Sequence, residues 1–191
     1  MLTFEPLQPE NFDRYAALQR DAGCGGCHCM FWHFEGDNRA WQLRDANDNC
    51  EAKRTLVDAQ KTHGVLALRD GIAVGSLQLE PRASLTKLTQ RMPYRDLEPL
   101  DAVWSIGCVL VHPDARKTGV ATALVQAAVD HSARWFGARW LEAYPRLGDE
   151  LRDEEQWMGP DVVYQRLGFE LTREHMQYPV YRRELPRIVT L

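Results

Sequence analysis

The sequence lacks any run close to the roughly 20 apolar residues that a helix needs to cross a bilayer. Its opening segment, residues 1–12, includes Glu5 and Glu10 and lacks the basic-then-apolar order of a signal peptide. It also lacks an excess of positive charge, since the formal net charge of its 191 residues is −4 at pH 7. We therefore expect a cytoplasmic protein with reduced thiols, and neither a membrane nor a nucleic acid as its partner.

Internal repeats and low-complexity linkers are missing as well, so we assign residues 1–191 to a single domain. Apolar periodicity predicts strands and helices that alternate along the chain. The expected strands are 2–7, 65–69, 72–79, 103–111, 138–145 and 175–185, and the expected helices are 9–20, 48–64, 119–135 and 162–167. Asp70-Gly71 is a strong hairpin signal, and the polar segment 81–102 is expected to be a short-helical crossing or a binding loop. This order fits a mixed α/β sheet covered by helices.

The most informative segment is 103–121, where a strand, a basic turn and a helix follow one another. It begins with an almost unbroken apolar and β-branched run, which Pro113 ends because proline cannot donate to a sheet ladder. From Gly119 onward the apolar residues recur at helical spacing. The first amides of a helix have no intrahelical partner, so together with Arg116 and Lys117 they form a site for an anion such as a pyrophosphate.

The six residues from Arg116 to Ala121, Arg-Lys-Thr-Gly-Val-Ala, resemble the acetyl-coenzyme A signature Arg/Gln-x-x-Gly-x-Gly/Ala of the GNAT superfamily of N-acetyltransferases. Segments 138–145 and 162–169 look like the fifth strand of that family and its next helix with a Tyr-x-x-x-Gly-Phe turn. The resemblance runs from about Val65 to about Leu185. It implies the acyl-CoA N-acyltransferase fold, a mixed and mostly antiparallel central sheet flanked by helices. It also implies acetyl-coenzyme A (acetyl-CoA) as co-substrate and direct attack by an amine in a ternary complex.

The same resemblance implies a small-molecule or peptide amine as acceptor and is compatible with a homodimer. It assigns cofactor-binding roles along the strand and the turn. The predicted set is Val109, Leu110, Val111, Arg116, Lys117, Thr118, Gly119, Val120 and Ala121. Backbone groups of Val109 and Val111 would pair with the pantetheine arm, and an amide near Leu110 would polarise the thioester carbonyl.

Two residues are predicted to move protons. Tyr164 stands where the resembled family often carries a tyrosine that protonates the leaving thiolate, and a phenol (pKa near ~10) is close enough to a thiol (near ~8.5) for this. The alternative is that its ring only packs on the inner face of the helix. Glu80, at the end of a strand, is the predicted base, with His112 and Glu142 as the next candidates and a water relay as a further route.

The segment 24–33 is rich in cysteine, and several interpretations stay open. Cys24, Cys27 and Cys29 invite a zinc site, but the pattern lacks a second pair of ligands, so no metal is predicted. Cys24 and Cys27 are also spaced as a redox pair. The interpretation we favour is a buried loop that lines the acceptor cleft. The segment resembles the start of a GNAT subgroup, Gly-Gly-Cys-x-x-Cys-Trp-Cys-Met-Tyr, with His28 in place of the tryptophan.

One alternative of a different class is a non-catalytic acyl-CoA-binding protein, or a Cys-rich redox or metal sensor. Binding of another nucleotide is disfavoured, because the turn lacks the Gly-x-x-x-x-Gly-Lys pattern of a P-loop. Cys108, inside the strand 103–111, is most simply a small core residue. The sequence thus predicts an acetyl-CoA-dependent N-acetyltransferase and does not identify the acceptor amine.

Overall fold

A seven-stranded sheet forms the centre of the protein in a computed structural model that describes residues 1–23 and 26–187. Its strands are β1 (Leu2–Pro6), β2 (Gly64–Arg69), β3 (Ile72–Pro81), β4 (Val103–Val111), β5 (Trp140–Ala143), β6 (Glu170–Arg173) and β7 (Val180–Glu184). Their order is β1-β2-β3-β4-β5-β7-β6, and every neighbouring pair is antiparallel except β4 and β5. The mixed, mostly antiparallel sheet that the sequence predicts is confirmed.

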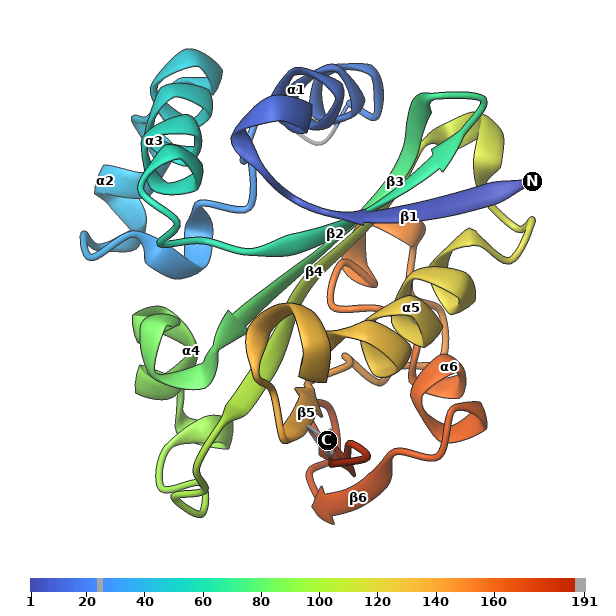
Figure 1. The fold of residues 1–191 in the computed structure, drawn as a ribbon. Coiled ribbons are helices and arrows are strands. Elements are labelled where there is room, and N and C mark those ends of the chain that lie inside the picture. Colours follow the sequence, from blue (N-terminus) through green and yellow to red (C-terminus); the bar gives the residue numbers. More distant parts are fainter. Residues whose placement is uncertain (24–25, 188–191) are drawn as a thin grey trace.

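Helices cover both faces of this sheet. They are α1 (Phe12–Asp21), α2 (Asn38–Gln42), α3 (Ala46–Asp58), α4 (Thr86–Gln90), α5 (Val120–Phe136) and α6 (Asp161–Arg166). Figure 1 shows α1 and α3 on one side of the strands and α5 and α6 on the other. Leu124 of α5 packs with Ile106 in the core of one face, and Phe12 of α1 packs with Leu66 in the core of the other. Within the described ranges, no helix is long and apolar enough to span a bilayer.

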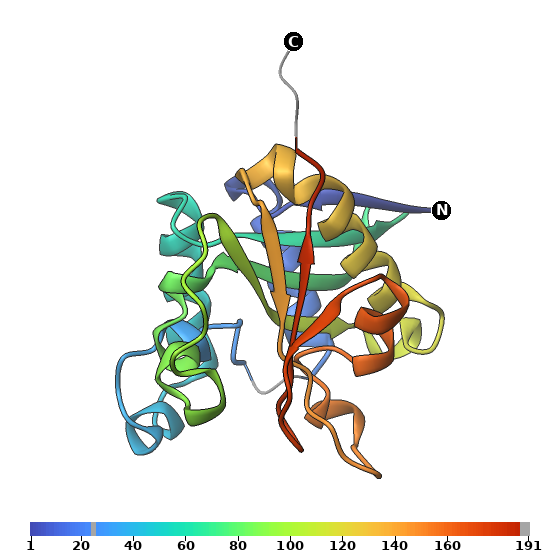
Figure 2. The same ribbon diagram turned by 90° about the horizontal axis from the view of Figure 1, so that it is seen from below.

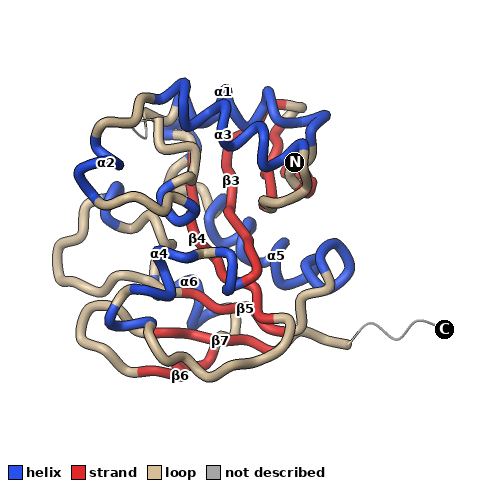
Figure 3. The backbone as a smooth tube through the Cα atoms, turned by 90° about the vertical axis from the view of Figure 1, so that its left-hand side faces the viewer, coloured by secondary structure: helices blue, strands red, loops and turns tan. Residues whose placement is uncertain are grey.

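The sheet contains two hairpins, one of β2 with β3 and one of β6 with β7. Asp70 and Gly71 join β2 to β3 with φ values of 53° and 81°, the mirror-image turn that suits the twist of a hairpin, so that prediction is confirmed. The closing strand expected over 175–185 is β7, and it forms a hairpin with β6, which begins earlier, at Glu170, and was not predicted (Figure 3). β6 is mostly exposed, so its sequence carries no apolar alternation that would have revealed it.

The helix predicted over 48–64 is displaced. α3 begins at Ala46 because the Asp45 side chain accepts a hydrogen bond from the amide of Asp48 and caps the helix. It ends before Gln60, whose left-handed φ of 54° turns the chain away. Gly64, which the sequence suggested as the helix terminator, instead opens β2.

The crossing between β3 and β4 has the short-helical character that the sequence predicts. α4 lies within it, between two single turns of 3-10 helix at Arg82–Ser84 and Met92–Tyr94. The crossing packs beside the cysteine-rich segment (Figure 2). The Lys87 ammonium there lies 4.9 Å from the centre of the Phe31 ring.

The pairing of β4 positions the candidate site. β4 pairs with β3 along nearly its whole length, from Trp104 to Val111. With β5 it pairs only through residues 103–105. Over the described residues the second half of β4 therefore borders no strand on that side and faces α5 and the segment that precedes α6.

Candidate active site

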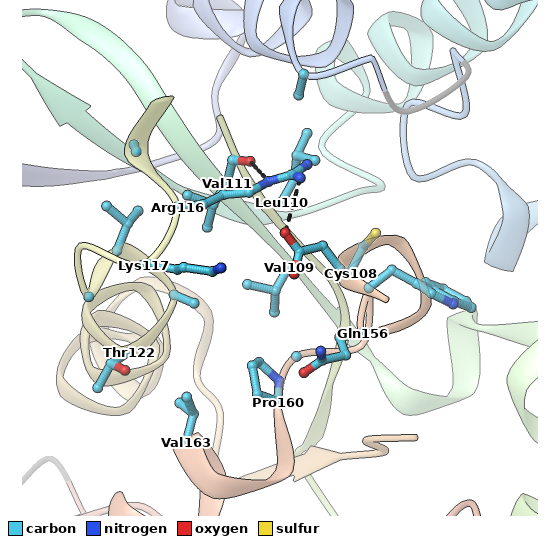
Figure 4. Close-up of a pocket in the computed structure, with 18 of the residues that line it drawn as sticks. Cys108, Val109, Leu110, Val111, Arg116, Lys117, Thr122, Gln156, Pro160 and Val163 are labelled. Atoms are coloured by element: carbon cyan, nitrogen blue, oxygen red, sulfur yellow. Dashed lines mark hydrogen bonds and ion pairs between the residues drawn. The ribbon is translucent and has the colours of Figure 1, made fainter. Parts of the chain in front are cut away.

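A cavity of about 600 Å³ opens beside the second half of β4, between the start of α5 and segment 153–163. Eight of the nine predicted cofactor-binding residues line it: Val109, Leu110, Val111, Arg116, Lys117, Gly119, Val120 and Ala121. Thr118 is not among the lining residues, because its hydroxyl donates to the Ala115 carbonyl (2.7 Å) and closes the turn. Figure 4 shows Lys117 reaching from the turn toward Val109.

The turn before α5 has the geometry of an anion site. Gly119 has a φ of 84°, and a Cβ added there would meet no atom within 4 Å, so the space above the glycine is open. α5 starts at the next residue and runs for 17 residues. The amides of Val120, Ala121 and Thr122 therefore have no partner within the helix, and the positive end of its dipole points into the same space. A phosphate group fits this arrangement.

The backbone of β4 presents amides to the cavity in alternation. The amide of His112 donates to Val74 of β3 (2.9 Å), whereas the amide of Val109 points the other way and donates to the carbonyl of Trp157 (2.8 Å). By this alternation the amide of Leu110 faces β3. Of the amides near Leu110, that of Val109 points away from β3, and Leu110 itself lines the cavity; the polarising role stays a prediction.

Segment 153–159 forms bonds with groups that are predicted to bind the cofactor. The carboxylate of Asp153 pairs with the Arg116 guanidinium at 3.3 Å, and the Trp157 carbonyl accepts from the amide of Val109. The carbonyl of Met158 accepts from the hydroxyl of Tyr164 at 2.5 Å. Sequence reasoning missed these roles, because the acidic run 149–155 contains no pattern that tells which carboxylate folds back onto the turn.

Tyr164 lies one layer behind the cavity wall. Its side chain is fully buried, and its hydroxyl packs directly against Gly159, which lines the cavity. Burial raises the pKa of this phenol well above its ordinary value. The predicted acid role stays a prediction. To reach the cavity, the hydroxyl would have to release the Met158 carbonyl and move past Gly159.

Glu80 is the centre of a buried polar cluster. Its carboxylate accepts hydrogen bonds from Thr62 and from the backbone amide of His63 (3.1 Å), and the rings of His33 and His63 each approach it at 3.2 Å. Burial opposes its ionisation, but the contacts with His33 and His63 and the charge of Lys53 outweigh it and lower the pKa to about 2. The carboxylate is not a lining residue of the cavity, so a base role would need a relay.

The next two base candidates are also held by partners. Glu142 is fully buried and accepts from Arg82, Arg182 and Tyr144 at 2.7–3.0 Å. The ring of His112 caps the turn that follows β4 by accepting from the amide of Asp114 (3.3 Å). Neither side chain lines the cavity.

The described part of the cysteine-rich segment forms one wall of the cavity beside β4, while its predicted place in the acceptor cleft stays a prediction. Cys27 and Cys29 line the cavity. Trp32 anchors the segment, because its indole N–H donates to the Gly107 carbonyl of β4 (3.2 Å) and its ring stacks on Trp157 at 5.1 Å. Cys24 lies outside the described residues.

Measuring bound metal distinguishes the two interpretations of the cysteine-rich segment, a cavity wall and a zinc site. Among residues 1–23 and 26–187, no three histidine, cysteine or acidic side chains gather as metal ligands would. We expect protein purified without chelator to contain much less than one metal ion per chain by elemental analysis. A structural zinc site contributes directly to folding, so losing one of its ligands would lower the melting temperature. Without such a site, Cys24→Ser should leave the melting temperature little changed. Stoichiometric zinc together with chelator-induced unfolding would contradict this.

Comparisons with known proteins identify the family and the fold. The model of the acetyltransferase (GNAT) family matches residues 27–148, more than half of the chain. No curated protein is detectably similar in sequence. The resemblance to a cysteine-rich subgroup is not tested by these comparisons and stays a prediction.

Solved structures match the fold over nearly its whole length. The aminoglycoside acetyltransferase AAC(6')-Ib, in complex with coenzyme A, matches with a TM-score of 0.61 at 15% identity, covering 96% of this chain and 95% of its own. The yncA protein from Salmonella typhimurium, with acetyl-CoA, matches at 0.56 and 12%, covering 99% and 96%. An N-acetyltransferase from Staphylococcus aureus Mu50 matches at 0.57 and 13%, covering 97% and 99%. At these identities the likeness establishes the acyl-CoA N-acyltransferase fold.

Proposed function

Because this chain belongs to the acetyltransferase (GNAT) family, we propose that it moves an acetyl group from acetyl-CoA to an amine, by direct attack of the amine in a ternary complex. The observation that carries the proposal is the cavity beside β4, into which Gly119, the first amides of α5 and two basic side chains all face. The similar folds that were solved with acetyl-CoA or coenzyme A support acetyl-CoA as the co-substrate.

The lining residues fit the parts of acetyl-CoA. Arg116 and Lys117 with the amides at the start of α5 would hold the pyrophosphate, as charge-assisted donors do. The cavity-facing backbone of Val109 and Val111 would pair with the pantetheine arm. The Val109 amide would donate to the thioester carbonyl and stabilise the negative charge that develops there.

The acceptor amine has to lose a proton before it attacks. An amine with a pKa near ~10.4 is neutral in only about one molecule in a thousand near pH 7. With its low pKa, Glu80 is a weak base by itself. In this proposal it acts through His33, 3.2 Å away, and a water relay.

Segment 153–159 has to move when acetyl-CoA binds. Asp153 holds Arg116, and the Trp157 carbonyl holds the amide of Val109, so both groups must exchange partners. The adjacent Met158 holds the hydroxyl of Tyr164. One displacement of this segment would therefore release the anion site, the polarising amide and the predicted acid together.

Neutralising Asp153 should strengthen the binding of acetyl-CoA. Asp153→Asn frees Arg116 from an ion pair whose two side chains are 37% and 52% exposed. Exposed pairs are worth about 0.2–1 kcal/mol, so we expect affinity to rise by roughly 1.4- to 5-fold in calorimetry. Asp149→Asn removes the same charge from the same acidic run and is the matched control. An equal gain in both variants would mean that only net charge matters.

A panel of amines tests the proposed reaction. Alkylamines, aminoglycosides, free amino acids and peptide N-termini are each mixed with acetyl-CoA, and free thiol is measured along with the mass of the product. We expect at least one amine to give thiol and N-acetylated product in equal amounts. Binding of acetyl-CoA without thiol release from any amine would instead favour the non-catalytic acyl-CoA-binding alternative.

A further inference from the structure

Two cysteine side chains meet at the cavity, and the proposed transfer uses neither of them. Cys29 comes from the cysteine-rich segment, and Cys108 comes from β4 (Figure 4). Both line the cavity. A side-chain hydrogen bond with Cys108 is the largest influence on the pKa of Cys29, so the two side chains lie next to each other on the cavity lining. From the sequence, Cys108 is predicted only to pack in the core, because nothing local indicates which loop covers that face of β4.

The surroundings of Cys29 favour a thiolate. The side-chain amide of Gln19 on α1 points its nitrogen at the sulfur from 3.8 Å. The Tyr15 side chain, on the same helix, is buried, and among the described residues its hydroxyl has no hydrogen-bond partner of standard geometry. The hydrogen bond from Cys108, the charge of Lys53 on α3 and the contacts with Tyr15 and Gln19 outweigh burial and lower the pKa of Cys29 to about 7. A thiolate is the form of cysteine that attacks carbonyl carbon.

The backbone holds Cys29 in an unusual conformation. His28 and Cys29 have φ values of 47° and 56°, left-handed values that cost energy in residues other than glycine. The Gln78 side chain on β3 donates to the Cys29 carbonyl (3.2 Å), and the amide of Met30 donates to the carbonyl of Cys27 (2.9 Å). These contacts fix the sulfur against β4.

This position is next to the group that would hold the acetyl carbonyl. Cys108 directly precedes Val109, whose amide faces the cavity and is proposed to donate to the thioester oxygen. Because Cys29 lies next to Cys108, its sulfur lies at the same end of the cavity. The anion site around Gly119 lies further along the same cavity.

We propose that Cys29 is an acylation site, which takes the acetyl group from bound acetyl-CoA when no amine is present. The inference rests on the proposed function, because it requires acetyl-CoA in this cavity. A bond forms between the Cys29 sulfur and the acetyl carbonyl carbon, and the bond from that carbon to the coenzyme A sulfur breaks. Cys29 attacks as the thiolate, having lost its proton to solvent, and the departing coenzyme A thiolate takes a proton from solvent. One thioester replaces another, so nothing is oxidised or reduced and an amine can still take the acetyl group.

Mass spectrometry without an acceptor tests the inference. The protein is incubated with acetyl-CoA alone, quenched in acid and digested for peptide mapping. We expect the mass of one acetyl group on Cys29, removable by neutral hydroxylamine as a thioester is. Cys29→Ala should abolish this label. Cys50→Ala, which removes a cysteine on α3 that does not line the cavity, is the matched control and should leave the label unchanged.

A second readout follows the thiolate itself and needs no acetyl-CoA. The rate at which iodoacetamide alkylates Cys29 should reach half its maximum near pH 7, and in Cys108→Ala that midpoint should move to higher pH because the donor that lowers the pKa is gone. This profile, measured by mapping the alkylated peptide, should change little in Cys50→Ala.

Calorimetry separates a failure of this inference from a failure of the proposed function. Acetyl-CoA that binds but leaves no acetyl group on Cys29 overturns the inference alone. So does label that falls on Cys24 or Cys27, or that persists in Gly119→Glu, because it would then not come from the bound molecule. If acetyl-CoA does not bind at all, the proposed function and the inference fall together.

Discussion

Gly119→Glu should abolish the binding of acetyl-CoA while the protein stays folded. The substitution places a carboxylate in the open space above the first amides of α5, where the pyrophosphate is proposed to lie. The new charge occupies the helix N-terminus and repels the phosphates, and the side chain fills the space they need. Calorimetry should detect no binding, and circular dichroism should show an unchanged fold.

The other end of α5 supplies a control for backbone strain. Gly137 has a φ of 71°, and a Cβ added there would also meet no atom within 4 Å. Gly137→Glu therefore carries the same conformational cost, of about 1–2 kcal/mol, without touching the cavity. It should keep full affinity for acetyl-CoA.

Arg116→Ala should weaken binding by about 1–3 kcal/mol, the usual range for a lost charge-assisted contact. Unchanged affinity in a folded Gly119→Glu variant would remove the anion site from the proposal.

Local signals in the sequence were enough to predict the strand, turn and helix that surround the proposed anion site. The apolar run of β4, Pro113 at its end and the glycine before α5 lie within 20 residues of one another, and each has a direct effect on the backbone. The Asp70-Gly71 turn is equally local. Such features do not depend on how distant parts of the chain pack.

Long-range packing decided the rest of the site. Glu80 is placed correctly at the end of β3, but its partners His33 and Lys53 come from segments far away in the sequence. Nothing local to Glu80 indicates that they hold it as a carboxylate with a low pKa. The contacts of Asp153 with Arg116 and of Cys29 with Cys108 arise in the same way. The residue types were enough to predict the chemistry of these groups. Which of them are accessible could be seen only from the fold.

For Tyr164, too, the residue type predicts the chemistry, while its access to the cavity depends on the fold. That access is linked to segment 153–159. The hydroxyl donates to Met158, whose neighbour Trp157 accepts from the amide of Val109. If acetyl-CoA displaces Trp157 from that amide, the shift of the backbone also reaches Met158 and frees the hydroxyl. Burial raises the pKa of Tyr164, so the phenol should keep its proton at ordinary alkaline pH. We therefore expect no alkaline fall in the wild-type rate from this group near pH ~10, where an exposed tyrosine would titrate.

Tyr164→Phe should lower kcat by roughly 10²–10⁴, the range for one lost general acid, and leave the KM for acetyl-CoA nearly unchanged. The ring and its packing on Phe169 remain, and only the proton donor is removed. Loss of the hydrogen bond to Met158 should cost about 1 kcal/mol of stability, which thermal unfolding measures separately. Tyr181→Phe is the matched control, because it removes a hydroxyl that accepts from Gln165 on α6 and does not line the cavity. A Tyr164→Phe enzyme that keeps most of its turnover would make Tyr164 a packing residue, and the thiolate would then leave unprotonated or take its proton from water.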